Sequence, residues 1–185
     1  MEQHVCPVWV GYLLLSPVRK LLTNPGRILG PYVSPGMTVL DAGTAMGFFS
    51  LPLARIVGES GHVVCADIQE KMLASLKKRA VSAGLESRIE FRLCTPESLA
   101  IGDLSGRVDF ALAFAVVHEV PDPRRFFSEI FNALKKGGSL LFSEPAGHVS
   151  RDGFNSSLSL ARAVGFEIHE TRKIFRCHSA LLTRP

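Results

Sequence analysis

The stretch Val39–Ser50 reads VLDAGTAMGFFS and combines a short apolar run with a loop of small residues. An apolar run that ends in an acidic residue before a turn is typical of a buried strand. Behind it, Gly43, Ala45 and Gly47 occupy every second position, and apolar residues then recur at helical spacing as far as Val57. A strand, a small-residue loop and a helix in this order favour a ligand-binding turn in a parallel α/β sheet.

Short apolar runs and helical periods alternate along the rest of the chain. The pattern predicts strands over 38–41, 62–67, 88–93, 108–115 and 139–144, and helices over 48–57, 70–83, 123–134 and 154–164. Two closing strands are expected over 166–173 and 176–183, in parallel or antiparallel pairing. This alternation predicts an α/β fold: a Rossmann-like, doubly wound, mostly parallel seven-stranded sheet with helices on both faces.

Local signals mark several element boundaries. Asn24-Pro25 and Asp122-Pro123 each place a capping side chain before a proline, which is typical of a helix start. Lys135-Lys136-Gly137-Gly138 combines basic residues with a turn, so it is expected to end the helix before it.

One domain accounts for the whole chain, with residues 1–36 as an N-terminal helical lead and residues 37–185 as the main sheet. In the lead, Trp9, Tyr12 and Leu13 fit three roles: a lid over a substrate, part of the core, or an apolar surface for peripheral membrane contact. The sequence does not indicate an oligomeric state.

The composition restricts the function classes. The chain has 185 residues, of which 46% are hydrophobic and 21% charged, as in an ordinary globular protein. The net charge is +4, but basic clusters such as Lys77-Lys78-Arg79 lie beside helical stripes and are expected on a solvated face, which disfavours nucleic acid as a partner. The four cysteines form no CxxC pair, so neither a metal site nor a disulfide framework is predicted, and a cytoplasmic location is expected.

The loop after the first strand also indicates the kind of ligand. A dinucleotide fingerprint would place its third glycine at position 48, where this chain has Phe48, so a ligand without a pyrophosphate is favoured over a nicotinamide cofactor. Asp67 ends the second strand about 20 residues after Gly47, where a carboxylate can accept bonds from both ribose hydroxyls. Taken alone, Asp67 fits a cap for the next helix equally well.

Three segments in order resemble class I S-adenosylmethionine-dependent methyltransferases, in particular the small subgroup of ubiquinone/menaquinone-biosynthesis-like enzymes. VLDAGTAMGFFS (Val39–Ser50) resembles the first motif of the family, and VVCADIQEKML (Val63–Leu73) the second. VDFALAFAVVHEVPDPRRFFSEIFNALKKGGSLLFSEP (Val108–Pro145) resembles the fourth strand, its helix and the fifth strand. The similarity runs from about residue 36 to at least residue 166, and the ordered set is far more specific than any single loop.

The resemblance implies S-adenosylmethionine as the cofactor, with S-adenosylhomocysteine as the product, and assigns cofactor contacts. Asp41, Gly43, Ala45 and Gly47 would surround its methionine end and ribose. Asp67 would hold the ribose hydroxyls, Ile68 would lie against the adenine, Thr95 and Pro96 would flank the adenine edge, and Ala113 to Ala115 would line the sulfonium side. Two residues depart from the family pattern: Ala45 replaces the middle glycine, and Thr95 replaces a frequent carboxylate.

Catalytic candidates are expected beyond the fourth and fifth strands. His118 is the best candidate for a general base because its unperturbed pKa lies near neutrality, and Glu144 is expected to position the substrate. Both have plainer interpretations, in which His118-Glu119 orders a loop and Glu144 bonds to loop amides. Glu119 and His148 are weaker candidates on position alone.

These inferences favour methyl transfer to a small-molecule, apolar acceptor. Two alternatives remain open at this stage: a non-catalytic module that binds S-adenosylmethionine or S-adenosylhomocysteine, and an RNA or protein methyltransferase that relies on a partner for recognition. The fourth-strand sequence Ala113-Phe-Ala-Val-Val-His118 lacks the Asn/Asp-Pro-Pro-aromatic motif of exocyclic-amine enzymes and a cysteine nucleophile, which disfavours nucleic-acid methylation.

Overall fold

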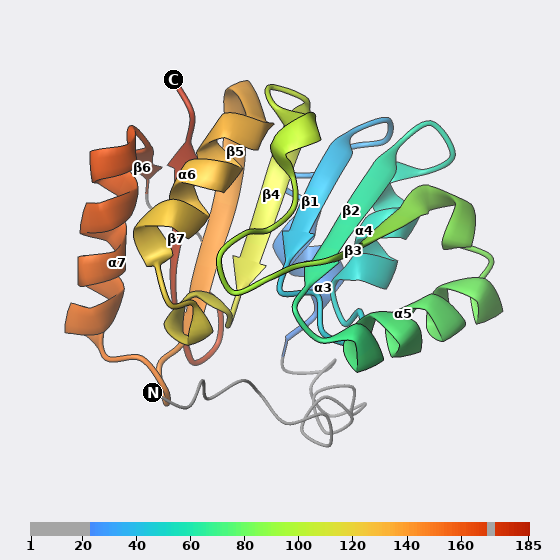
Figure 1. Cartoon of the computed structure of the whole chain (residues 1–185), viewed down its shortest axis with the longest axis horizontal. Coiled ribbons are helices and arrows are strands. Elements are labelled where there is room, and N and C mark those ends of the chain that lie inside the picture. Colours follow the sequence, from blue (N-terminus) through green and yellow to red (C-terminus); the bar gives the residue numbers. More distant parts are fainter. Residues whose placement is uncertain (1–22, 170–172) are drawn as a thin grey trace.

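The structure, a computed structural model, describes residues 23–169 and 173–185 and contains one sheet with the strand order β3-β2-β1-β4-β5-β7-β6 (Figure 1). The strands are β1 (Thr38–Ala42), β2 (His62–Asp67), β3 (Ile89–Leu93), β4 (Val108–Phe114), β5 (Leu134–Pro145), β6 (Glu167–His169) and β7 (Cys177–Thr183). The five strands from β1 to β5 pair in parallel, whereas β7 runs antiparallel to both of its neighbours, β5 and β6. The predicted doubly wound, mostly parallel sheet is confirmed.

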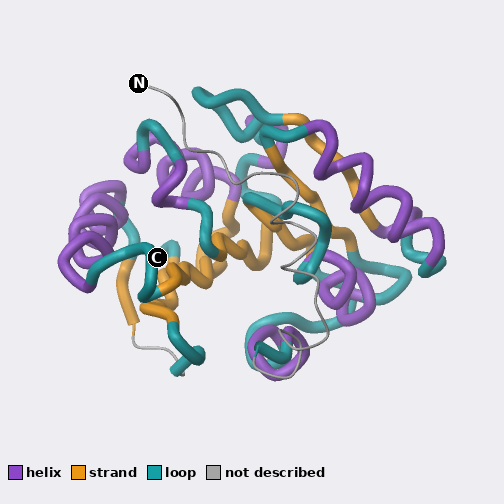
Figure 2. Tube along the Cα trace, turned by 90° about the horizontal axis from the view of Figure 1, so that it is seen from below, coloured by secondary structure: helices purple, strands orange, loops and turns teal. Residues whose placement is uncertain are grey.

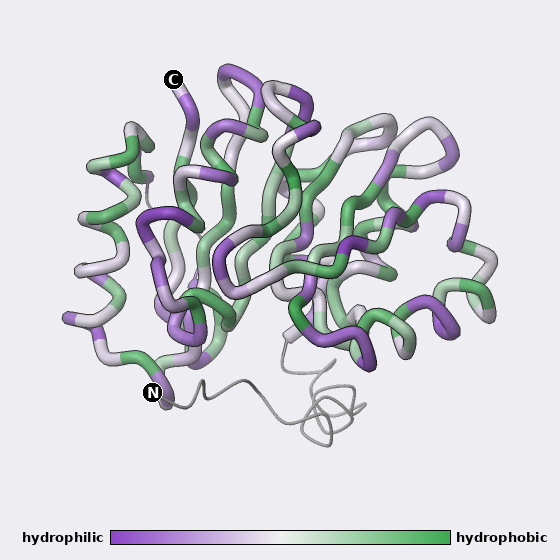
Figure 3. Tube along the Cα trace, viewed as in Figure 1, coloured by the Kyte–Doolittle hydropathy of each residue, from purple (hydrophilic) through white to green (hydrophobic). Residues whose placement is uncertain are grey.

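Helices cover both faces of the sheet, as the edge view in Figure 2 shows. They are α3 (Pro25–Leu29), α4 (Ser50–Val57), α5 (Glu70–Ser82), α6 (Pro123–Ala133) and α7 (Arg151–Val164). Successive residues of a strand point to opposite faces, so Val39 packs with α3, α4 and α5, whereas Leu40 packs with α6 and α7. The apolar runs of the sequence therefore supply two cores that share one sheet, and the strands form the hydrophobic interior in Figure 3.

The predicted caps are confirmed. The Asn24 side chain accepts a hydrogen bond from the Arg27 amide at 3.3 Å, and Asp122 accepts one from the Arg125 amide at 3.0 Å. Each cap satisfies an amide that the first helical turn leaves without a backbone partner.

The end of the helix before Lys135 is confirmed, but the turn predicted over Lys135–Gly138 is wrong. Helix α6 ends at Ala133, and Leu134 already pairs with Val108 of β4. Residues 135–138 are an irregular part of β5, where the register with β4 shifts, and the Arg184 amide donates to the Gly138 carbonyl. Pairing with the chain beyond β7, which the local sequence does not reveal, keeps this glycine-containing segment in the sheet.

Of the predicted helical lead, residues 1–22 lie outside the described residues, with Trp9, Tyr12 and Leu13 among them. The described part contains α3, which packs Leu29 onto the sheet. Within residues 23–169 and 173–185, no helix is both long and apolar enough to cross a bilayer.

Candidate methyltransferase site

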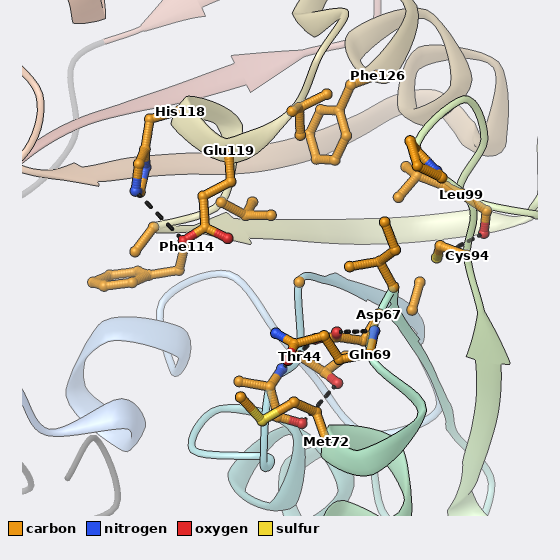
Figure 4. A pocket seen from close by; sticks show the side chains of 18 of the residues that line it. Thr44, Asp67, Gln69, Met72, Cys94, Leu99, Phe114, His118, Glu119 and Phe126 are labelled. Atoms are coloured by element: carbon orange, nitrogen blue, oxygen red, sulfur yellow. Dashed lines mark hydrogen bonds and ion pairs between the residues drawn. The ribbon is translucent and has the colours of Figure 1, made fainter. Parts of the chain in front are cut away.

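A cavity of about 720 Å³ opens at the carboxyl edge of the parallel strands (Figure 4). Its walls come from the loops after β1, β2, β3 and β4 and from the residues that precede β7. This is the edge where open α/β sheets bind ligands, and the volume is in the usual range for small-molecule sites.

The loop after β1 takes left-handed backbone conformations at alternate positions. The φ angles are 79° at Gly43, 46° at Ala45 and 83° at Gly47, which explains the small residues seen in the sequence. A Cβ atom added to Gly43 would lie 2.5 Å from Cγ2 of Val116, so the loop also packs closely against the segment after β4. Ala45 adopts the conformation that a glycine would adopt without strain.

Asp67 joins this loop to the end of β2. Its side chain is 8% exposed, and its two oxygens accept hydrogen bonds of 2.8 Å from the amides of Ala45 and Gln69. Burial raises the pKa of the Asp67 carboxyl, and the backbone hydrogen bonds oppose that rise. Helix α5 begins at Glu70 with Gln69 in its N-cap position, so the bond from the Gln69 amide lies before the first helical turn and Asp67 is not the helix cap. The bond to Ala45 was not predicted. Since an ionised carboxylate offers about four lone-pair sites, Asp67 retains acceptor capacity toward the cavity.

Asp41 lies behind the loop and does not line the cavity. It is 3% exposed and accepts a 2.5 Å hydrogen bond from the Ser50 hydroxyl. Burial, with a smaller contribution from the charge of Asp67, raises the pKa of Asp41 to about 7 against the lowering effect of Ser50. The geometry gives Asp41 contact with the base of the loop rather than with a bound ligand.

The residues that the resemblance places around the adenine belong to the cavity wall. Ile68, Thr95 and Pro96 all line it, and Ile68 is 36% exposed although it is apolar. Cys94 and Met72, which are labelled in Figure 4, also line the cavity and were not predicted. An apolar wall next to a carboxylate suits a flat base attached to a ribose.

Of the residues that the resemblance places beside the sulfonium, one lies in the core and another lines the cavity. Ala113 is fully buried in β4 and does not line the cavity, whereas Ala115 does. Ala115 has a φ of 57°, and its amide donates to the Ser143 carbonyl at 2.8 Å. Gly47 lines a separate, smaller cavity behind the loop.

His118 and Glu144 form a hydrogen-bonded pair. Glu144 is 1% exposed, and its Oε1 accepts from the amides of Val117 at 2.8 Å and His118 at 3.2 Å. Its Oε2 lies 2.6 Å from Nδ1 of His118, and that hydrogen bond raises the pKa of His118 against the opposing effect of burial. His118 lines the cavity and Glu144 does not, so Glu144 can act on a ligand there only through His118.

Two other predicted candidates flank this pair. Nε2 of His118 lies 3.8 Å from a carboxylate oxygen of Glu119, and Figure 4 shows both side chains in the cavity. The ring centroids of His118 and His148 are 6.0 Å apart. In the part of the chain that the structure describes, no group of three or more histidine, cysteine, aspartate or glutamate side chains is placed to hold a metal ion.

A family model described as a methyltransferase domain matches residues 33–175. This range contains the loop after β1, Asp67 and the His118–Glu144 pair. The chain belongs to the methyltransferase domain family. The class I, S-adenosylmethionine-dependent type expected from the three motifs is thereby confirmed.

Relatives and solved structures agree with this assignment. An arsenite methyltransferase of Halobacterium salinarum is 31% identical over 112 residues, which cover 60% of this chain and 28% of that protein. A ubiquinone/menaquinone biosynthesis C-methyltransferase of Vibrio vulnificus is 32% identical over 114 residues, or 60% of this chain and 43% of that protein. The chain thus matches less than half of the length of these curated relatives. The crystal structure of an S-adenosylmethionine-dependent methyltransferase from Aquifex aeolicus shares the fold, with a TM-score of 0.86, 23% identity and coverage of 98% of this chain and 100% of that one.

Part of this methyltransferase site was missed by sequence reasoning. Phe175, Arg176 and Cys177 line the cavity next to Pro145 and His148. Because β7 runs antiparallel to β5, the residues before β7 return to the edge where β5 ends. A firm antiparallel assignment of the last strand would have placed residues 175–177 at this edge. The apolar pattern alone left the direction of that strand open. Met72 lies on the apolar stripe of α5, where a ligand contact cannot be told from core.

Proposed function

We propose that this methyltransferase domain binds S-adenosylmethionine in the cavity and transfers a methyl group to a small, apolar acceptor. The observation that carries the proposal is the placement of Asp67 and His118 in the walls of one hollow. A ribose-binding carboxylate and an oriented imidazole are the two polar groups that this reaction can use. Asp67 is the last residue of β2 and His118 follows β4, so both lie at the ligand-binding edge of the sheet.

The residues of the cavity fit the cofactor. Asp67 would accept from the ribose hydroxyls with the lone pairs that Ala45 and Gln69 leave open. Ile68 and Pro96 would cover the two sides of the adenine, and Ala115 would lie toward the sulfonium. Bound S-adenosylmethionine supplies a methyl group on a positively charged sulfur, which is an already activated leaving group.

We assign His118 as the general base. With Oε2 of Glu144 at 2.6 Å from Nδ1, the proton of the neutral ring belongs on Nδ1, because the carboxylate can only accept. Nε2, which lies 3.8 Å from a carboxylate oxygen of Glu119, then carries the lone pair that can accept a proton from the acceptor within the cavity. This assignment favours an acceptor that must lose a proton when it is methylated, such as a hydroxyl group or an activated C–H group.

The aromatic side chains near His118 support an apolar acceptor. Phe48, Phe49 and Phe114 line the cavity, and the ring centroids of Phe49 and Phe114 are 4.6 Å apart. Phe175, which lines the same cavity, is 57% exposed. The similarity to a ubiquinone/menaquinone biosynthesis C-methyltransferase supports the same acceptor class.

Calorimetric titration with S-adenosylhomocysteine tests the cofactor assignment. Wild type is expected to bind saturably, and Asp67→Ala is expected to lose binding. Because Asp67 also holds two backbone amides, Ile68→Asn serves as a second variant that leaves those bonds intact. Val81→Asn is the matched control, since Val81 is an exposed apolar residue of α5 outside the cavity. Absence of wild-type binding at millimolar ligand contradicts the cofactor assignment.

Methyl transfer is tested separately, with isotope-labelled S-adenosylmethionine and a panel of phenols, quinols and other apolar acceptors. We expect turnover by wild type and a loss of about 10²-fold in kcat for His118→Gln, the lower end for a general base. Saturable cofactor binding without turnover on any acceptor favours the non-catalytic binding module. Turnover only with RNA or protein substrates contradicts the small-molecule assignment.

A further inference from the structure

A second, smaller cavity of about 280 Å³ lies behind the cofactor loop. Gly47 and Phe48 of the loop form one side, and Arg55 of α4 and Arg79 of α5 contribute two guanidinium groups. Phe48 belongs to the walls of both cavities. The small cavity is therefore a separate site that shares one wall with the proposed cofactor site.

The two arginines lack carboxylate partners within residues 23–169 and 173–185. Three arginines of the domain, Arg88, Arg92 and Arg125, form ion pairs with a glutamate or an aspartate. No such pair involves Arg55 or Arg79, and no acidic side chain lines the small cavity. Outside the described residues, the sequence contains only two acidic side chains, Glu2 and Glu170.

Arg79 has a definite position, which differs from the solvated face expected for Lys77-Lys78-Arg79. Its guanidinium is half-buried and donates to the Met46 carbonyl of the loop. Burial lowers the pKa of Arg79, and the nearby charge of Arg55 lowers it further. Two like charges around one partly buried cavity repel each other, and a bound anion would remove that repulsion.

We propose that Arg55 and Arg79 form a binding site for a small doubly charged oxyanion, namely free phosphate or the phosphate group of a small ester. A guanidinium has five N–H donors in a planar fork that matches phosphate oxygens. Arg79 uses one of its nitrogens on the Met46 carbonyl, so donors remain for a ligand. A bound oxyanion would hold Arg79 against Met46 and thereby support the loop from behind.

Thermal unfolding without cofactor tests this site independently of the proposed methyl transfer. Wild type is titrated with sodium phosphate and with glycerol phosphate, each against sodium chloride at equal ionic strength. A ligand that binds only the folded state raises the midpoint in a saturable manner. The variant is Arg55→Gln, which leaves the Arg79–Met46 contact intact, and the control is Arg124→Gln. Arg124 is an exposed arginine of α6 outside both cavities, so its loss changes the net charge equally.

We expect a saturable rise for wild type and Arg124→Gln, with apparent affinity at least tenfold weaker in Arg55→Gln. A stronger response to glycerol phosphate than to free phosphate assigns the ligand to phosphate esters, and the reverse assigns it to the free ion. Equal responses of wild type and Arg55→Gln, or no response beyond that to sodium chloride, overturn the proposal. Tighter binding of a single-stranded oligonucleotide that depends on Arg55 overturns the assignment to a small ligand.

Discussion

Replacing Glu144 by glutamine tests how His118 is tuned. Three N–H groups face the Glu144 carboxylate: the amides of Val117 and His118 on Oε1, and Nδ1 of the His118 ring at Oε2. Glutamine has only one carbonyl oxygen, and the two backbone amides fix it at the Oε1 position. Its NH₂ group then faces Nδ1, which must become an acceptor, so the ring proton moves to Nε2. The substitution therefore removes a charge and also reverses the tautomer of His118.

The size of the effect follows from the hydrogen bond. A bond to a charged group contributes about 1.5–3 kcal/mol. The His118 side chain is 25% exposed, so solvent screening favours the lower end, about 1.5 kcal/mol. We expect the pKa of His118 to fall in Glu144→Gln, because the bond to Glu144 is the main cause of its rise. If His118 is the base, kcat falls by about 10²-fold even at high pH, because Nε2 is already protonated.

The sign of the stability change follows from linkage. The folded-state pKa of His118 is raised, so its stabilising contribution is fully present below the ordinary value of about 6.5 and is lost as the pH rises through the raised pKa. The free energy of unfolding of Glu144→Gln should thus lie below that of wild type at pH 5–6, with the difference shrinking by about pH 8.

The assay is an NMR titration of the histidine ring protons, with the His118 signal assigned by its absence in His118→Gln. Glu119→Gln is the control. The Glu119 carboxylate lies 3.8 Å from Nε2 of His118, and its effect on the pKa of His118 is smaller than the effects of Glu144 and of burial. The Glu119→Gln substitution should lower the pKa of His118 by less than half of the decrease that Glu144→Gln causes. An unchanged pKa of His118 in Glu144→Gln refutes the reasoning.

Three further predictions concern the loop and its base, each measured by denaturant unfolding. Ala45→Gly should change the free energy of unfolding by less than about 0.5 kcal/mol, because relief of the left-handed strain offsets the added chain entropy, whereas Ala80→Gly within α5 should cost at least about 1 kcal/mol. Equal losses in the two variants contradict the strain at Ala45. Gly43→Ala should cost more than about 2 kcal/mol, and Val116→Ala in the same chain should restore only part of it, since the clash is relieved but the positive φ remains. Full recovery of the free energy of unfolding in the double variant would mean that the positive φ at position 43 carries no strain for alanine. Because the pKa of Asp41 is raised to about 7, the free energy of unfolding of wild type should decrease as the pH rises from 4 to 7. The same rise in pH should lower the free energy of unfolding of Asp41→Asn by less. Parallel pH profiles contradict that protonation state.

The fold was largely predictable because its signals are local. The buried strands β2 and β4 carry continuous apolar runs, and the helix starts at Asn24 and Asp122 carry capping side chains. The error at residues 135–138 has the opposite origin. Two glycines after a helix normally end the element. Here Leu134 pairs with Val108 of β4 on one side and Gly137 and Gly138 pair with Arg184 on the other, which extends the strand. Local propensity was overridden by partners distant in the sequence.

The site was predictable where the family motif fixes a position on a strand end, and not where the role depends on side-chain direction. Asp41 and Ala113 lie within the matched segments, yet their side chains point into the interior. Glu144 was expected to position the substrate, whereas the structure gives it contact with loop amides and with His118. The role of such a carboxylate depends on which way its side chain points in the folded chain, and the sequence alone does not give that direction.

Asp67 shows why cofactor affinity and loop order are coupled in this domain. The same carboxylate that faces the predicted ribose position accepts from the amide of Ala45, the residue under strain in the loop. Without that acceptor, the partly buried amide would lose its partner at a cost of about 1 kcal/mol, comparable to the strain itself. Substitution of Asp67 therefore removes a ligand contact and releases the loop at the same time. Only a comparison with Ile68→Asn, which affects the ligand wall alone, separates the two contributions.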